Sequence, residues 1–103
     1  MGDTVKWLAY DFQVHRMEPA WNDVPGVYIF TGIASDGKWH PYYVGKADSF
    51  KTRLVSGHEQ WAPAKNQRAT HVHAMVVRDE TQRTKIEKEL IQKLGPPLNT
   101  QHK

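Results

Sequence analysis

The segment GVYIFTGIASDGKWHPYYVGK, residues 26–46, determines the fold of this chain. Residues 27–31 are dense in β-branched and aromatic side chains, which favour a β-strand. The sequence SDGK at residues 35–38 is typical of a tight hairpin turn, and residues 39–44 form the return strand. Pro41 in the return strand indicates an edge strand or a β-bulge. The segment therefore predicts an antiparallel hairpin.

Outside this hairpin the sequence predicts two more strands and two helices. Apolar and polar residues alternate over 8–14, which indicates a half-buried N-terminal strand, and residues 70–77 indicate the third strand of the core. A first helix is expected from residue 48 or 49 to about 56, and a second from about 81 to 94. The prediction is an α/β (α+β) fold: a small three-stranded antiparallel sheet flanked by helices, with an extra N-terminal strand.

The composition excludes several classes of protein. The 103 residues suffice for one domain, with 39% hydrophobic and 24% charged residues, and no apolar run is long enough for a membrane span or a signal peptide. The absence of cysteine excludes disulfides, iron–sulfur clusters, thiolate zinc sites and a cysteine nucleophile. We therefore predict a single cytoplasmic domain, residues 1–103, that does not bind a membrane.

The charge is unevenly distributed along the chain. Residues 1–37 hold two basic and five acidic side chains, whereas residues 38–103 hold twelve basic and six acidic ones. A basic C-terminal part suits an anionic partner such as nucleic acid. The alternative is that the lysines only solvate helix faces.

Two tyrosines of the predicted hairpin form a first candidate site. If the turn has two residues, Tyr28 lies opposite Gly45 and Phe30 lies opposite Tyr43. Tyr28 and Tyr43 are then diagonal neighbours on one sheet face, and Gly45 leaves space beside the Tyr28 ring. A bulge at Pro41 would change this register. Because strands are rich in tyrosine, a purely structural role is the alternative.

Glu87 is the second candidate. At about 100° per residue it falls inside the apolar arc of its helix, between Ile86 and Ile91, whereas Glu89 falls on the outer, solvent-facing side. A carboxylate that faces a core must be paired or must bind a cation. Two interpretations are open: a local ion pair with Arg83, four residues earlier, or a metal ligand.

Three basic residues follow the second tyrosine. The Lys46 ammonium is close in sequence to Tyr43 and would favour its phenolate, which lowers the pKa of that tyrosine. Arg53 lies on the helix that begins just after this strand, so it can fold back and hold a phosphate. His58, beyond that helix and near Arg53, is a candidate for proton transfer.

These residues together resemble the GIY-YIG nucleases. Residues 26–28 (GVY) and 43–45 (YVG) look like the two motifs that name the family. The sequence YVGKA at residues 43–47, with Arg53 ten residues after Tyr43, is similar to the version in the bacterial excision-repair incision subunit.

The C-terminal part carries the same resemblance. Glu87 is followed by Leu90-Ile91, Pro96 and Asn99, as in the family's C-terminal motif, and Asn99 lies twelve residues after Glu87. The family-like core runs over residues 26–99, and residues 1–25 form an N-terminal extension.

The resemblance implies a metal-dependent endonuclease that hydrolyses DNA phosphodiester bonds, as in DNA repair or restriction. Glu87 would hold one divalent ion, Mg²⁺ or Mn²⁺, and Arg53 would stabilise the transition state. Tyr43 would be the general base, made more acidic by Lys46, and Tyr28 would position the water or the phosphate. Asn99 would support the geometry of the site. The substrate-binding set is Gly45, Lys46 and Arg53, and the catalytic set is Tyr28, Tyr43, Lys46, Arg53, His58, Glu87 and Asn99.

The chain departs from the family pattern at Gly57 and in the fifteen-residue interval from Tyr28 to Tyr43, which is long for compact members. Many members have a histidine or tyrosine four residues after the arginine, where this chain has Gly57, and His58 follows one step later. Family nucleases usually take their specificity from a second domain or a partner. Three alternatives are open here: cleavage of structured or flexible DNA with low specificity, self-association, or action with a partner protein. The alternative functions are a non-catalytic module that binds nucleic acid or protein on the same fold, and a structural protein.

Overall fold

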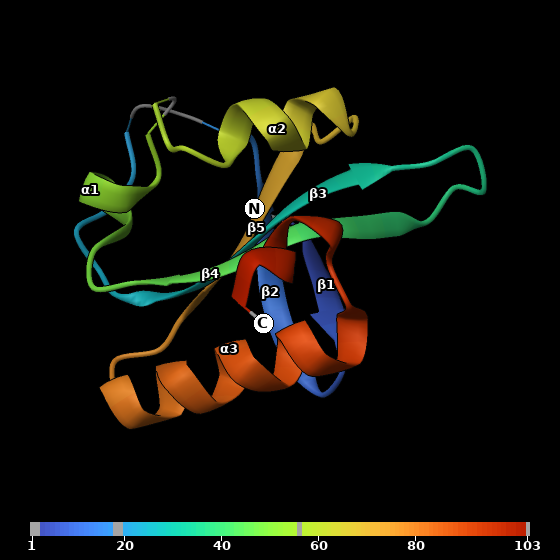
Figure 1. Ribbon diagram of the computed structural model, residues 1–103. Helices are drawn as coiled ribbons and strands as arrows, with labels where there is room; N and C mark the ends of the chain where they lie inside the picture. The colour runs from blue at the N-terminus through green and yellow to red at the C-terminus, as the bar shows by residue number, and fades with distance from the viewer. Residues whose placement is uncertain (1–2, 18–19, 56, 103) are drawn as a thin grey trace.

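The structure is a computed structural model that describes residues 3–17, 20–55 and 57–102. In these residues one antiparallel sheet has five strands in the order β1-β2-β5-β3-β4 (Figure 1). The strands are β1 (Thr4–Trp7), β2 (Tyr10–His15), β3 (Gly26–Ile33), β4 (Trp39–Ala47) and β5 (His71–Val76). The helices are α1 (Phe50–Arg53), α2 (Trp61–Asn66), α3 (Glu80–Leu94) and the 3₁₀ segment η1 (Pro97–His102).

The predicted mixed fold with an antiparallel sheet is confirmed, but the strand number was wrong. The three core strands β5, β3 and β4 are neighbours as expected. Ahead of them lie two strands instead of one: β1 and β2 pair as a hairpin from Thr4↔Gln13 to Trp7↔Tyr10. Leu8, which the alternation placed in a strand, has φ 57 and lies in the tight turn between them. Five strands result.

The two faces of the sheet carry separate cores. On one face, which we call the tyrosine face, Tyr28, Phe30 and Tyr43 pack against residues of α1 and α2 such as Phe50 and Trp61. The opposite face, which we call the α3 face, is formed by Phe12, Val27, Ile29 and Val44, packed against Ile86 and Leu90 of α3. Figure 1 shows α1 and α2 on one side of the sheet and α3 on the other.

The pairing of β3 with β4 is as predicted near the tyrosines, although the turn between the strands has a different length from the predicted one. Tyr28 pairs with Gly45 and Phe30 with Tyr43. The turn is one residue longer than expected, because the Ala34 N–H donates to the Lys38 carbonyl across three residues. A register shift between Phe30 and the following residue adds one residue on β4, so the two deviations cancel. The bulge indicated by Pro41 is therefore present and preserves the pairing.

The helices agree with the prediction at the C-terminus and differ in the middle. The helix predicted over 81–94 is α3, capped by Asp79, which accepts from the Gln82 N–H, and ended by Gly95 with φ 59. The first predicted helix is shorter: α1 ends at Arg53, because Leu54 leaves helical geometry and is buried in the core. Its predicted end at Ser56 lies outside the described residues. The helix α2 was not predicted.

No helix among the described residues is long and apolar enough to cross a membrane.

Candidate active site

The tyrosines of the two motifs lie together on the tyrosine face. The ring centroids of Tyr28 and Tyr43 are 6.3 Å apart. The Tyr28 ring lies over Gly45, where a Cβ would be 2.4 Å from the phenol oxygen. Tyr28 is fully buried and Tyr43 is 8% exposed. The predicted diagonal contact is confirmed, and the space beside Gly45 is filled by the Tyr28 phenol.

His58 reaches the same cluster from the segment between α1 and α2. Its ring centroid is 5.7 Å from the ring of Tyr28 and 5.7 Å from that of Tyr43. The Nε2 atom is 2.7 Å from the Tyr28 hydroxyl, and the Nδ1 atom accepts from the Gln60 backbone N–H at 3.0 Å. The loop after α1 thus compensates for Gly57 and brings the histidine to the tyrosines.

These contacts fix the tautomer of His58. Burial, followed by the nearby Arg53 charge, lowers the pKa of His58 to about 4, so the ring is neutral at neutral pH. Because Nδ1 accepts a hydrogen bond, the ring proton is on Nε2, which donates to the Tyr28 oxygen. The hydroxyl hydrogen of Tyr28 is then directed to another group. In this arrangement the neutral ring of His58 donates to Tyr28, and the proton-transfer role predicted for His58 stays a prediction.

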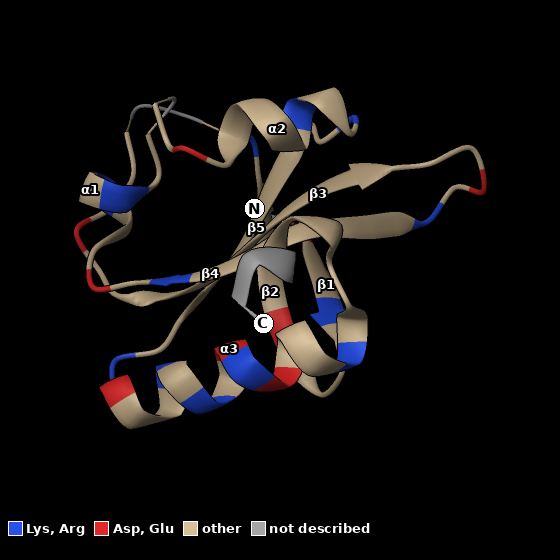
Figure 2. Ribbon diagram, viewed as in Figure 1, with Lys and Arg blue, Asp and Glu red and all other residues tan. Residues whose placement is uncertain are grey.

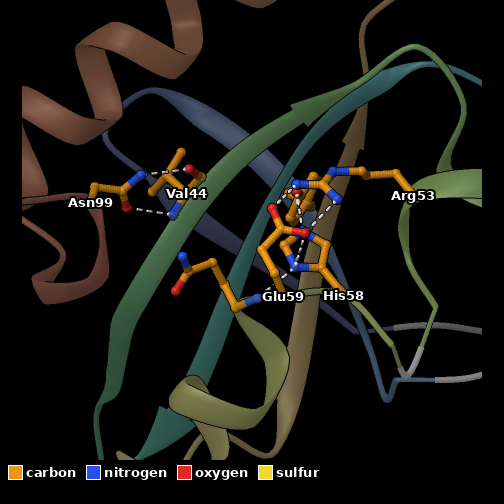
Figure 3. A network of polar contacts seen from close by, with 7 residues as sticks. Val44, Arg53, His58, Glu59 and Asn99 are labelled. Carbon is orange, nitrogen blue, oxygen red and sulfur yellow. Dashed lines mark hydrogen bonds and ion pairs between the residues drawn. The ribbon is translucent and has the colours of Figure 1, made fainter. Parts of the chain in front are cut away.

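Arg53 lies at the end of α1 beside both phenols, and its guanidinium is occupied. Its Nη1 and Nη2 atoms donate to the two carboxylate oxygens of Glu59 at 3.0 and 2.5 Å (Figure 3). The hydrogen bonding to Glu59 raises the pKa of Arg53 and lowers that of Glu59 to about 2. The sequence did not predict this role of Glu59. It lies six residues after Arg53, beyond the end of a short helix, and such a separation predicts no contact.

The acidity of the two tyrosines is set mainly by burial. Burial raises the pKa of Tyr28 well above its ordinary value, and the charge and hydrogen bonding of Arg53 oppose this. The pKa of Tyr43 is also raised by burial, while Arg53 lowers it and the charges of Glu59 and Glu87 raise it. Arg53 is therefore a cation that favours the phenolate of either tyrosine.

The predicted influence of Lys46 on Tyr43 is wrong. Side chains alternate along β4, so Lys46 points to the α3 face, and its Nζ donates to the Thr84 hydroxyl at 2.9 Å. The pKa of Tyr43 is raised, not lowered. Lys46 is exposed on the edge strand, where it adds positive charge beside α3.

Glu87 lies on α3 and acts on the cluster through its charge. It is half-buried, and its charge acts on Tyr43. It also borders a hollow of about 800 Å³ with Tyr10, Lys85, Lys88, Glu89, Ile91 and Gln92. The alternative partner, Arg83, donates to the carbonyl oxygens of Val77 and Arg78 and to Asp48.

Glu87 suits a magnesium site of the single-carboxylate kind. No three His, Cys, Asp or Glu side chains gather as metal ligands in the part of the chain that the structure describes. Mg²⁺ is usually held by one or two carboxylates, and waters and substrate phosphates complete its coordination. Glu87 is half-buried and its charge acts on Tyr43, so its carboxylate could hold such an ion within electrostatic reach of the phenols.

Glu89 differs from its predicted position on the helix surface. It is half-buried, and its carboxylate accepts from the Tyr10 hydroxyl at 2.6 Å. The reason is the unpredicted β1–β2 hairpin, which brings Tyr10 next to α3.

Asn99 binds the backbone between Tyr43 and Gly45. Its Oδ1 accepts from the Val44 N–H at 2.8 Å, and its Nδ2 donates to the Val44 carbonyl at 2.9 Å (Figure 3). The buried amide of η1 thus pairs with the outer edge of β4 as a neighbouring strand would. It holds in place the strand that carries Tyr43.

Basic side chains lie around this site. Figure 2 shows lysines and arginines on α1, α2, β4 and along α3, with acidic residues among them. Lys46, Lys85 and Lys88 lie near Glu87, two of them in the wall of the same hollow. Such a surface can contact a polyanion, although Glu89 shares the hollow.

Comparisons with known proteins identify one family of similar sequences and structures. Residues 24–100 match the family described as the UvrC-like GIY-YIG domain. The chain is similar to the magnesium-bound GIY-YIG N-terminal endonuclease domain of UvrC from Thermotoga maritima, with 30% identity and a TM-score of 0.62 over 77% of this chain and 86% of that chain. A Tyr-to-Phe mutant of that domain, bound to its catalytic divalent cation, is 31% identical to this chain, with a TM-score of 0.60 over 77% of this chain and 86% of that chain. An Asn-to-Ala mutant of the same domain is 30% identical to this chain, with a TM-score of 0.60 over 74% of this chain and 82% of that chain. No curated protein sequence matches the chain.

Proposed function

The chain belongs to the family of UvrC-like GIY-YIG domains, and we propose that it is a metal-dependent endonuclease that hydrolyses phosphodiester bonds in DNA. The observation that carries this proposal is the convergence of Tyr28, Tyr43 and Arg53 on one face, with Glu87 within electrostatic reach of Tyr43. These groups can supply a base, a hydrogen-bond donor, a cation and a metal-binding carboxylate.

Tyr43 is the proposed general base for the attacking water. It is less deeply buried than Tyr28, and Arg53 favours its phenolate. The charge of Glu87 opposes ionisation of Tyr43, so a cation held by this carboxylate would lower the pKa of the tyrosine.

Tyr28 is the proposed positioning group. The His58 Nε2–H donates to its oxygen, which leaves its own hydroxyl hydrogen to donate to the water or to a phosphate oxygen. The burial of Tyr28 keeps it protonated, as a donor must be. The two tyrosines thus take opposite roles because their surroundings differ.

Glu87 would hold one divalent ion, Mg²⁺ or Mn²⁺, which when bound acts as a Lewis acid on the scissile phosphate. Arg53 would contact the same phosphate and stabilise the charge that develops on it. Lys46, on the α3 face, would bind the DNA backbone, and Asn99 would keep β4 in place. Supply of specificity by a partner protein or by self-association stays a prediction.

The test is a cleavage assay on supercoiled plasmid and on branched or flapped oligonucleotides, with magnesium, manganese or chelator. We expect metal-dependent cutting that Glu87→Gln abolishes, while DNA binding in chelator persists. Glu89→Gln is the matched control, since it makes the same charge change on the same helix and leaves cutting in place. A Glu87→Gln protein as active as the parent would contradict the proposal. Salt-sensitive DNA binding by the parent without cutting would favour the non-catalytic module.

A further inference from the structure

The guanidinium of Arg53 is the group best suited to bind a phosphodiester, and it already binds a carboxylate. Both terminal nitrogens donate to Glu59, one to each oxygen. A phosphodiester also presents two non-bridging oxygens, which a guanidinium binds through the same pair of parallel hydrogen bonds. Glu59 and a substrate phosphate therefore compete for the same two donors.

The position of Glu59 is fixed by its neighbours and does not depend on the ion pair alone. The adjacent His58 side chain is fully buried. It is bonded at one ring nitrogen to Tyr28 and at the other to the Gln60 N–H. This anchors the backbone of residues 58–60 against the tyrosine face. Glu59 thus projects from a fixed backbone, and its carboxylate stays within reach of Arg53.

The negative charge of Glu59, like its hydrogen bonds, opposes the binding of a phosphate to Arg53. On the tyrosine face the phenols and His58 are neutral at neutral pH, so Arg53 carries the positive charge of the cluster. Glu59 cancels that charge at the place where a phosphate would be attracted. Its charge also acts on Tyr43, whose pKa it helps to raise.

We propose that Glu59 is a substrate-mimicking carboxylate that occupies the phosphate-binding donors of Arg53, so that the site takes only phosphodiesters that displace it. This inference rests on the proposed nuclease function and adds a residue that sets substrate affinity. The ion pair is easily opened: Arg53 is 37% and Glu59 61% exposed, and solvent-exposed pairs are weak. Binding by a well-placed DNA phosphate is then sufficient to displace Glu59.

The main variant is Glu59→Gln, which removes the charge and keeps the size of the side chain. We expect it to bind a fluorescein-labelled flapped duplex in chelator about two- to fivefold more tightly than the parent, and its KM for cleavage to fall by a similar factor with no decrease in kcat. Glu59→Asp keeps the charge on a shorter side chain and is expected to give a smaller gain.

The matched control is Asp11→Asn. It makes the same change in net charge and breaks another exposed pair, Lys6–Asp11, on the β1–β2 hairpin. If Glu59→Gln binds DNA no more tightly than Asp11→Asn, the proposal is overturned. It is also overturned if kcat falls more than about tenfold while DNA affinity is unchanged, since Glu59 then only positions Arg53.

A second probe separates this inference from the nuclease function. Inorganic phosphate is titrated into each protein, and the side-chain N–H signals of Arg53 are followed by NMR. In Glu59→Gln these signals are expected to shift at lower phosphate concentration than in the parent. Equal titrations in the two proteins would overturn the competition even if the parent cleaves DNA. If the Arg53 signals of Glu59→Gln shift at lower phosphate concentration than those of the parent, the competition is supported even if the parent does not cleave DNA.

Discussion

Tyr28 lies directly opposite Gly45 across the β3–β4 ladder, and its phenol fills the space that a side chain at residue 45 would need. The first tyrosine of the site therefore depends on the glycine of the second motif. A Cβ at Gly45 would meet the Tyr28 oxygen at 2.4 Å, a distance that real contacts do not allow. The pair links the sequence motif to a steric requirement of the site.

Gly45→Ala is expected to displace the Tyr28 ring from the site. Cleavage should fall by about a hundredfold or more, because a misplaced catalytic group loses its alignment. The control is Gly57→Ala, since a Cβ there meets no atom within 4 Å. Plasmid nicking rates and thermal unfolding of both variants test this. Full activity of Gly45→Ala would show that the site does not depend on the position of Tyr28.

Asn99→Ala is expected to destabilise the fold by about 1–3 kcal/mol, because it leaves the Val44 N–H and carbonyl without their buried partner. Urea denaturation measures the change in the free energy of unfolding. Asn66→Ala, at an exposed amide of α2, is the matched control and should change stability little. Cleavage by Asn99→Ala should also fall, since Tyr43 and Gly45 flank Val44. Unchanged stability would mean that the edge of β4 needs no partner here.

The rate of cleavage is expected to rise with pH. Since the pKa of Tyr43 is raised above its ordinary value of 10.0, the phenolate fraction grows about tenfold per pH unit from neutral to alkaline pH. The measurement is kcat/KM against pH at saturating magnesium, and Tyr43→Phe should lose the slope. His58 contributes no step there, because its pKa is about 4. A plateau that begins near neutral pH would point to a base other than Tyr43.

Stability is expected to fall as the pH drops from about 6.5 to 4. Burial lowers the pKa of His58 and of His73 to about 4, from 6.5 in the unfolded chain. The unfolded chain therefore binds more protons in this window. Each histidine then contributes a loss of up to about 1.4 kcal/mol per pH unit. Urea denaturation across this range measures the slope.

His58→Gln and His73→Gln should each remove part of this slope. His73 accepts from the Trp7 indole N–H at 2.9 Å and lies away from the tyrosine face, so it separates stability from activity. A slope that persists in both variants would assign the acid sensitivity to other groups.

The sequence by itself determined the hairpin that carries the two motifs, the residues that form the cluster, and the helix that carries Glu87. These follow from local rules: strand-forming residues, a turn, a helix ended by glycine, and a set of motifs at family spacing. The Tyr28–Gly45 pairing could be predicted because alternation and register are local properties of a hairpin, and the bulge offset the longer turn.

Only the tertiary structure decided the surroundings of those residues. It placed Lys46 against Thr84 of α3, Tyr10 against Glu89, and Glu59 on Arg53. Each of these contacts depends on how a segment turns after a strand or helix ends, or on packing between elements distant in sequence. Local periodicity contains no such information, because charge and burial at a site come from every element that packs around it.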